Sequence, residues 1–142
     1  ATTMAFDAEF DAAVSLCQGA FGLVGPGPDE EVLAGMTRAL RPGGRIAVSA
    51  FSSYFSVRYQ TDADFDAASA TATEQTEVRS PDGTALAAAL HTTCYTPREL
   101  RLLAERAGLT EIDVWSVEPG AYATAPPTIE TAEFLVVGTR PE

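Results

Sequence analysis

Two stretches of this sequence decide its fold: FDAAVSLC at residues 10–17 and LRPGGRIAVSAF at residues 40–51. Each contains a short, nearly continuous apolar run, which is typical of a strand buried on both faces of a parallel sheet. Between them, a helix is predicted to begin near Pro28, because acidic residues come first, an apolar stripe follows at helical spacing, and arginines come last. Pro42-Gly43-Gly44 is expected to end this helix. The order predicts a βαβ unit with parallel strands and a right-handed crossover.

The middle of the chain is predicted to be an insertion. Residues 52–72 mix aromatic, small and acidic side chains, which indicates a helical or irregular segment. Residues 73–79 and 85–95 are separated by Ser-Pro-Asp-Gly, a turn sequence, and they predict a hairpin.

The last third of the chain is predicted to hold a helix and two strands. Thr96-Pro97-Arg98-Glu99 is a capping box with Pro at the first helical position, and Gly108 is expected to end the helix. Strands are predicted at residues 111–117 and 133–139, with a loop at 119–131 between them.

Length and composition favour one globular domain. The chain has 142 residues, of which 46% are hydrophobic and 20% charged. No run reaches the eighteen or so apolar residues of a membrane span, and no basic-then-apolar signal segment opens the sequence. We therefore expect a cytoplasmic protein with no membrane partner.

Charge and residue usage exclude several kinds of function. The formal net charge of -11 repels phosphate, so a nucleic-acid partner is not expected. Every basic residue is Arg, which rules out a Schiff-base lysine and a P-loop lysine. The single histidine and the two cysteines lack the spacing of a metal motif, so no metal site is expected. Both Cys17 and Cys94 are predicted to be reduced and buried.

The ordered elements resemble a known family. Residues 10–16, the following helix and the segment Leu-Arg-Pro-Gly-Gly-Arg-Ile at 40–46 resemble the fourth strand, fourth helix and fifth strand of class I S-adenosylmethionine-dependent methyltransferases. Residues 95–109 are similar to the last helix of that family, and residues 133–137 to its final antiparallel strand. The resemblance implies the C-terminal part of a Rossmann-like α/β methyltransferase sheet, with an inserted β-hairpin and a final antiparallel strand.

The sequence also departs from that family. The glycine-rich loop and the acidic residue that hold most of the cofactor in the family have no counterpart in residues 1–142. We therefore expect a single, N-terminally truncated domain that is inactive alone, with residues 52–95 inserted over the substrate side. Its first strand is expected to lack a neighbour on one side, and an exposed strand edge favours self-association.

The resemblance implies a cofactor site for S-adenosyl-L-methionine at the end of the first strand. Leu16, Cys17 and Gln18 would lie against its methionine part, and Ala1 near its adenine. Open α/β sheets bind ligands at the carboxyl ends of their strands, which agrees with this placement. Ordinary packing at a strand end remains the alternative.

Candidate acceptor-binding residues are Phe21, Phe51, Tyr54, Tyr59 and His91. Aromatic walls suit planar substrates or a sulfonium charge, although the same side chains would serve equally as core beneath the insertion. His91 is a candidate general base, but a lone histidine in a strand is more often structural.

The function implied by the resemblance is methyl transfer from S-adenosyl-L-methionine to a small-molecule acceptor that the sequence does not identify. Direct attack on the sulfonium depends chiefly on positioning, which leaves the catalytic residues unassigned. Two other classes stay open. One is a non-catalytic α/β interaction module that pairs through its exposed strand edge. The other is an α/β hydrolase, although no serine lies in a G-x-S-x-G turn.

Overall fold

The computed structural model describes residues 3–17, 21–23, 26–118 and 120–142. The predicted cofactor residues Ala1 and Gln18 lie outside these ranges. In chain order, the elements are β1 (Phe10–Ser15), α1 (Pro26–Ala39), β2 (Leu40–Ser52), α2 (Ser53–Tyr59), β3 (Asp64–Asp66), β4 (Thr71–Arg79), β5 (Ala85–Tyr95), α3 (Pro97–Arg106), β6 (Thr110–Glu118), β7 (Ala121–Ala125) and β8 (Glu133–Thr139).

The predicted βαβ unit is confirmed, because β1 and β2 pair in parallel and α1 connects them. The long strand β2 continues to an antiparallel partner, β8, and β8 in turn pairs antiparallel with β6. At its carboxyl end, β2 also pairs with the last residues of β5, through Phe51–Cys94 and Ser52–Tyr95. Most of the sheet is therefore antiparallel, and β1 with the end of β5 forms its parallel part.

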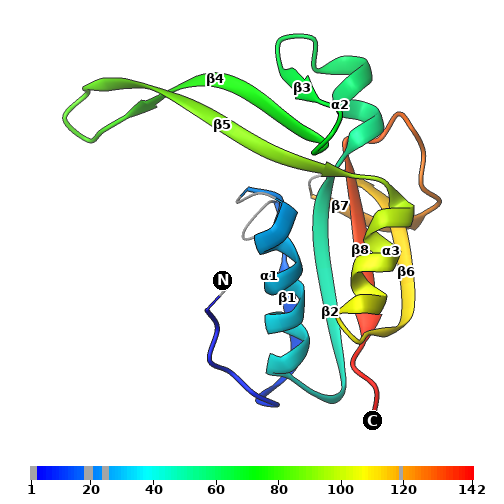
Figure 1. Ribbon diagram of the computed structural model, residues 1–142. Helices are drawn as coiled ribbons and strands as arrows, with labels where there is room; N and C mark the ends of the chain where they lie inside the picture. Colours follow the sequence, from blue (N-terminus) through cyan, green and yellow to red (C-terminus); the bar gives the residue numbers. More distant parts are fainter. Residues whose placement is uncertain (1–2, 18–20, 24–25, 119) are drawn as a thin grey trace.

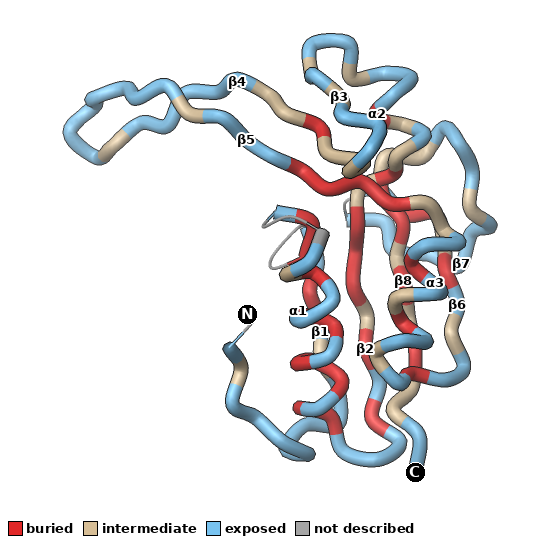
Figure 2. Tube along the Cα trace, viewed as in Figure 1, coloured by how far each residue is buried: buried red, intermediate tan, exposed pale blue. Residues whose placement is uncertain are grey.

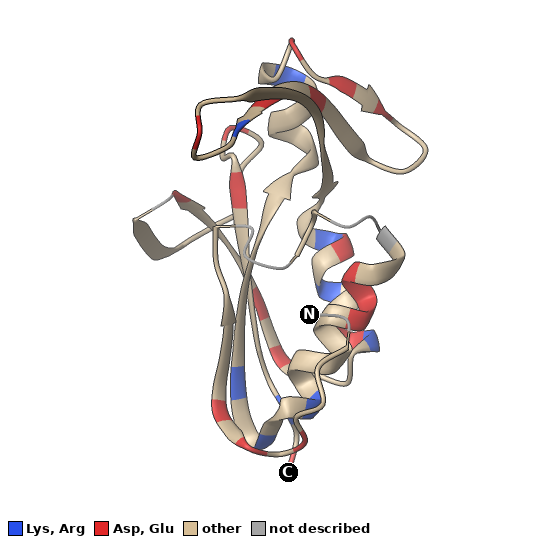
Figure 3. Cartoon of the chain, turned by 90° about the vertical axis from the view of Figure 1, so that its left-hand side faces the viewer, with Lys and Arg blue, Asp and Glu red and all other residues tan. Residues whose placement is uncertain are grey.

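The core lies between the sheet and the two longer helices. Figure 3 shows these helices, α1 and α3, on one side of the central strands. Alternate residues of β2, namely Ile46, Val48 and Ala50, point to this side and are buried, as the period of a strand requires. From α1, Val32 and Leu33 meet them, and both are at most 1% exposed. The apolar residues that recur at helical spacing in α1 and at strand spacing in β2 therefore pack together in one core.

The capping box that the sequence predicts is present at the start of α3. The hydroxyl of Thr96 accepts a bond from the backbone N–H of Glu99, and the Glu99 carboxylate accepts one from the Thr96 N–H. On the buried face of this helix, Leu100 and Ala104 pack into the core at 0% exposure. The cap and the apolar face together fix where α3 begins and how it lies on the sheet.

The predicted hairpin, β4–β5, projects from the body as a two-stranded ribbon (Figure 1). Its strands pair antiparallel from Thr71–Thr93 to Arg79–Ala85. Figure 2 shows that most of the ribbon is exposed and that β5 becomes buried only where it joins β2. The helical segment predicted within residues 52–72 corresponds to α2, and β3 adds a short third strand to the ribbon.

The outer edge of β1 is open within the part of the chain that the structure describes, because β2 is the one strand that pairs with it there. Val14 on this strand is 67% exposed and Phe10 is 41% exposed. A cavity of about 460 Å³ runs along the strand, between residues 4–16 and the Val32, Met36 and Ala39 face of α1. An apolar sheet edge is therefore left without cover in the described residues.

Four sequence predictions need correction. The first strand was predicted to be buried on both faces, but Ser15 is its one buried residue and its outer edge is open within the described chain. The loop predicted at residues 119–131 contains a strand, β7. All five of its residues are exposed, so no buried apolar face marks this strand in the sequence. Pro42-Gly43-Gly44 does not separate helix from strand but lies inside β2, where Gly43 adopts a positive φ of 75°. Cys17 is exposed and not buried, whereas Cys94 is buried as predicted; both thiols are free.

None of the described helices is long and apolar enough to cross a membrane.

Candidate functional site

The carboxyl end of β1 presents Leu16 and Cys17, two of the predicted cofactor residues. Leu16 is 37% exposed, and the Cys17 side chain is exposed too. Cys17 has a φ of 51°, a left-handed conformation that is uncommon for a residue with a side chain. Its backbone N–H donates to the hydroxyl of Ser49 on β2 at 2.9 Å, and Ser49 is fully buried. This bond fixes the chain as it leaves β1.

Tyr122 of β7 also lies at the carboxyl end of β1, beside Cys17. Its hydroxyl lies 3.4 Å from the Cys17 sulfur, although 105 positions separate the two residues. This contact raises the pKa of Tyr122 to about 12, and desolvation and the charges of Cys17 and Glu133 add to the shift. Tyr122 therefore remains a neutral phenol at physiological pH. Sequence reasoning missed it, because a tyrosine in a predicted loop carries no signal for such a contact.

Glu133 is a second residue that the sequence did not single out. It begins β8, pairs in register with Phe51 of β2 and is 5% exposed. Residues 49 and 51 project from one face of β2, and the partner of Phe51 shares that face. The side chains of Ser49 and Glu133 therefore lie on one face of the sheet, close to the point where β2 ends.

Asp29 holds the segment that follows β1. This buried carboxylate, at 0% exposure, accepts the backbone N–H of Gly22 at 2.9 Å and the hydroxyl of Tyr95 at 2.6 Å. Burial raises its pKa, and the two hydrogen bonds oppose that shift. A further bond from the Thr93 N–H to the Gly22 carbonyl, at 2.7 Å, ties the segment to β5. Residues 21–23 are thus anchored to α1 and β5.

The predicted acceptor residues are not all at one place. Phe21 is fully buried and its ring lies 5.0 Å from that of Tyr95, so it is a core residue. His91 is exposed on the β4–β5 ribbon, where Nδ1 lies 3.1 Å from the hydroxyl of Thr73. The structure thus brings His91 to a threonine of the ribbon and not to a strand end.

The other three acceptor candidates, Phe51, Tyr54 and Tyr59, lie in or beside α2. Phe51 is half-buried in β2, Tyr54 is 42% exposed with its ring edge-on to Phe134, and Tyr59 is 44% exposed. The Tyr59 hydroxyl is engaged, because it donates to the carboxylate of Glu130.

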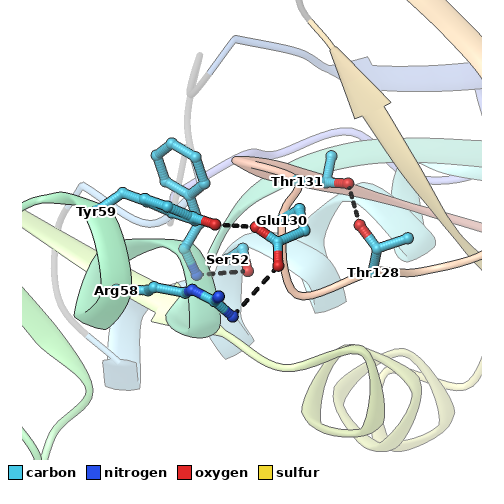
Figure 4. Close-up of polar contacts among 7 residues, drawn as sticks. Ser52, Arg58, Tyr59, Thr128, Glu130 and Thr131 are labelled. Carbon is cyan, nitrogen blue, oxygen red and sulfur yellow. Dashed lines mark hydrogen bonds and ion pairs between the residues drawn. The ribbon is translucent and has the colours of Figure 1, made fainter.

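A polar network fastens α2 to the loop before β8 (Figure 4). The hydroxyl of Ser52 caps α2 by accepting the Phe55 N–H at 3.2 Å. Glu130 forms an ion pair with Arg58 at 3.2 Å and accepts the Tyr59 hydroxyl. This helix therefore has a defined position beside the carboxyl end of β2.

Two of the predicted cofactor residues are accessible in the part of the chain that the structure describes. Among the described residues, no group of three His, Cys, Asp or Glu side chains is placed to hold a metal ion. Leu16 and Cys17 form an apolar, sulfur-bearing surface at the end of β1, which fits the methionine part of S-adenosyl-L-methionine.

Comparison with known proteins gives structural likeness without sequence likeness. No family model and no curated protein matches the sequence. The CcbJ methyltransferase from Streptomyces caelestis superimposes with a TM-score of 0.71 at 16% identity, over 94% of this chain and 58% of that protein. An S-adenosylmethionine-dependent methyltransferase from Clostridium acetobutylicum gives a TM-score of 0.72 at 10% identity, over 99% of this chain and 62% of its own.

A third structure, an S-adenosylmethionine-dependent methyltransferase from Methanosarcina mazei, gives a TM-score of 0.63 at 16% identity, over 99% of this chain and 64% of that one. The chain therefore spans about three fifths of the length of these three structures. At these identities the likeness concerns the fold. The observed architecture is a class I methyltransferase-like α/β fold, with an inserted hairpin and a final antiparallel strand, as the resemblance implied.

Proposed function

We propose that the intact protein transfers a methyl group from S-adenosyl-L-methionine to a small-molecule acceptor. The observation that supports this most strongly is the superposition on two methyltransferases at TM-scores of 0.71 and 0.72. The accessible residues at the carboxyl end of β1 agree with it, since open α/β sheets bind ligands at such ends. The proposal extends to a cytoplasmic location, with which the two free thiols are compatible.

In this proposal, Leu16 and Cys17 contact the methionine part of the cofactor, and Gln18 and Ala1 complete its binding. The cofactor supplies an electrophilic methyl group on a positively charged sulfur. The bond from the Cys17 N–H to Ser49 gives the first contacts a fixed geometry, so that little ordering is needed on binding. Because this chain supplies one side of the site, we expect it to be inactive alone.

Residues 52–95 are proposed to cover the acceptor, with Phe51, Tyr54 and Tyr59 as candidate contacts. A structural neighbour supports a small-molecule acceptor. The 1,6-didemethyltoxoflavin-N1-methyltransferase from Burkholderia thailandensis, with a TM-score of 0.53 and 17% identity, has 1,6-didemethyltoxoflavin and S-adenosylhomocysteine bound. This chain covers 48% of that protein. Exposed aromatic rings on α2 would suit an acceptor of that kind.

Calorimetric titration of S-adenosylhomocysteine into the intact protein tests the proposal. We expect binding, and we expect Leu16→Asp to weaken it by about tenfold or more, because a buried charge without a partner costs at least about 1.4 kcal/mol. The matched control is Leu86→Asp, which makes the same change at a leucine on the β4–β5 ribbon that is 62% exposed. The absence of binding by the intact protein would refute methyl transfer.

The second candidate is an interaction module that pairs through the edge of β1. Its support is the exposed apolar edge of that strand, where Val14 is 67% exposed. This function predicts no cofactor binding by the intact protein, together with loss of self-association when the edge is altered. The titration above therefore separates the two candidates.

A further inference from the structure

The two edges of the β4–β5 ribbon differ in chemistry. Strand β4 carries Glu74, Glu77 and Arg79, whereas β5 contains no Asp, Glu, Lys or Arg. Within the described residues, β5 pairs with β2 only through its last two residues, so residues 85–92 have no strand on their outer side. Charged side chains on an edge strand discourage the addition of another strand. The edge of β4 is therefore protected in this way, and the edge of β5 is not.

The ribbon also has an exposed apolar face. Val78 and Leu86 are cross-strand partners, and their side chains are 56% and 62% exposed. Leu90 lies on the same face of β5, because successive side chains of a strand alternate between its faces, and it is 41% exposed. A two-stranded ribbon without cover is at best marginally stable in water. This face and the free edge beside it are therefore expected to meet a partner.

The sequence of β5 is self-complementary. Leu86-Ala87-Ala88-Ala89-Leu90 reads the same in both directions. In a twofold contact, residue i of one copy meets residue j of the other, and j meets i. If two β5 strands pair antiparallel about an axis at Ala88, Leu86 of each copy lies opposite Leu90 of the other. A second copy of this chain thus extends the apolar face without a break.

The backbone of β5 fits the same register. The Thr93 N–H points away from β4, because it donates to the Gly22 carbonyl at 2.7 Å. Backbone groups of an antiparallel strand point to opposite edges at alternate residues, so those of residues 85, 87, 89 and 91 also point outward. These odd-numbered residues would form the hydrogen-bonded pairs of a β5–β5 ladder. Ala88 would then face Ala88 of the second copy in a pair without hydrogen bonds, with about 4.5 Å between their Cα atoms.

Charge favours this edge for contact between copies. Each chain carries a net charge of -11, so two copies repel each other wherever their acidic surfaces meet. In the joined ribbon, the charged residues of each β4 would lie on the outer strands. Three strand spacings, or about 14 Å, would separate the two β4 strands. This exceeds the Debye length of about 8 Å at physiological ionic strength, so their repulsion is largely screened.

We propose that β5 is a contact between two copies of this chain, with antiparallel β5 strands, a twofold axis at Ala88 and the two ribbons joined into one four-stranded sheet. The contact is independent of the proposed methyl transfer and lies on a different strand from the open edge of β1. The paired segment, residues 85–91, is shorter than the roughly 20–30 residues a side of a standard interface. We therefore expect a dissociation constant of about 10–100 µM.

Cross-linking at position 88 tests both the contact and its register. Ala88→Cys places two thiols across the axis at a Cα separation that a disulfide can span. Diamide serves as the oxidant and accepts the two electrons and two protons that leave as the disulfide forms. The matched control is Thr76→Cys, because Thr76 is the cross-strand partner of Ala88 on β4 and shares its face. Peptide mass spectrometry identifies each disulfide, since the exposed Cys17 thiol can also join two chains.

At a protein concentration of about 200 µM, we expect the disulfide at position 88 to form about tenfold faster than the one at position 76, because thiols held in one assembly meet at a high effective concentration. Equal rates at the two positions would indicate random collision and would overturn the proposal. The absence of a disulfide at position 88 would overturn it too. Circular dichroism of both variants verifies that each is folded.

A second measurement does not use thiol chemistry. Ala88→Glu sets two like charges opposite each other and should weaken association by about tenfold or more in sedimentation velocity. The control Thr76→Glu makes the same change on β4 and should leave association as it is. Both changes are made together with Val14→Arg, so that the edge of β1 does not contribute. Equal effects of the two glutamates would refute the β5 contact, whereas the S-adenosylhomocysteine titration bears only on methyl transfer.

Discussion

Replacing Tyr95 with phenylalanine is expected to destabilise the fold by removing the hydroxyl that bonds to Asp29. This hydroxyl donates to a fully buried carboxylate at 2.6 Å, and Tyr95 itself is 6% exposed. Hydrogen bonds to charged groups contribute about 1.5–3 kcal/mol, and water has no ready access to replace the lost donor. We therefore expect the free energy of unfolding at pH 7 to fall by about 2 kcal/mol. For a chain of this size, that corresponds to a decrease in Tm of roughly 6 °C.

The loss should depend on pH in a direction that follows from Asp29. Burial raises the pKa of this carboxyl above its ordinary value of 3.8, whereas the bond from Tyr95 lowers it. A raised folded-state pKa means that the stabilising contribution of the group is complete below the unfolded value and is lost as pH rises through the folded value. Tyr95→Phe raises that folded pKa further. The variant should therefore lose more stability relative to the parent at pH 7 than at pH 4.

Urea denaturation followed by circular dichroism at pH 4 and pH 7 measures both effects. The control is Tyr54→Phe, because Tyr54 is 42% exposed and its hydroxyl makes no hydrogen bond within the described residues. This control should change stability by less than about 0.5 kcal/mol. A similarly small loss for Tyr95→Phe, or a loss that is larger at pH 4, would show that the bond to Asp29 does not carry the stability assigned to it.

Three further perturbations test other parts of the fold. Thr96→Ala removes the N-cap of α3 and should cost about 1 kcal/mol in urea denaturation, whereas a loss below about 0.3 kcal/mol would contradict the capping box. Gly44→Ala places a Cβ 2.8 Å from the Arg41 carbonyl and should cost about 1–3 kcal/mol, whereas Gly27→Ala, with nothing within 4 Å, should be neutral or slightly stabilising; equal effects would refute the close approach. Val14→Arg places a charge on the open edge of β1 and should reduce concentration-dependent self-association in sedimentation velocity; a chain that is monomeric with either residue would refute association through that edge.

Periodicity and local capping made much of the fold predictable. The apolar runs around Val14 and Val48 were predicted to be the two strands of a βαβ unit, because a helical pattern lies between them in the sequence. The structure pairs these strands in parallel, with α1 as the connection. The start of α3 could be predicted because the side chains of Thr96 and Glu99 each accept a hydrogen bond from the backbone N–H of the other, within one turn. Such interactions connect residues that are close in sequence, so the residues themselves carry the signal.

The candidate site was predictable only in part. Leu16 and Cys17 could be placed at the end of a strand because the sequence pattern defines where that strand ends; their contact with the cofactor stays a prediction. Phe21 follows the same strand and is also apolar, so the sequence did not distinguish it from Leu16. In the structure its ring packs against Tyr95, a residue of the distant strand β5. The burial of an aromatic side chain depends on what the fold brings against it, and local sequence does not state this.

The sequence by itself determined the elements of this protein: the βαβ unit, the projecting hairpin, the capped helix and the final strand. Only the tertiary structure decided the chemistry between them. It placed the Tyr122 hydroxyl beside the Cys17 sulfur, buried Glu133 opposite Phe51, and closed Asp29 onto Gly22 and Tyr95. The physical reason is range: helical and strand periods are set by neighbours within a few positions, whereas a polar cluster depends on strands that meet after their connections have crossed the sheet.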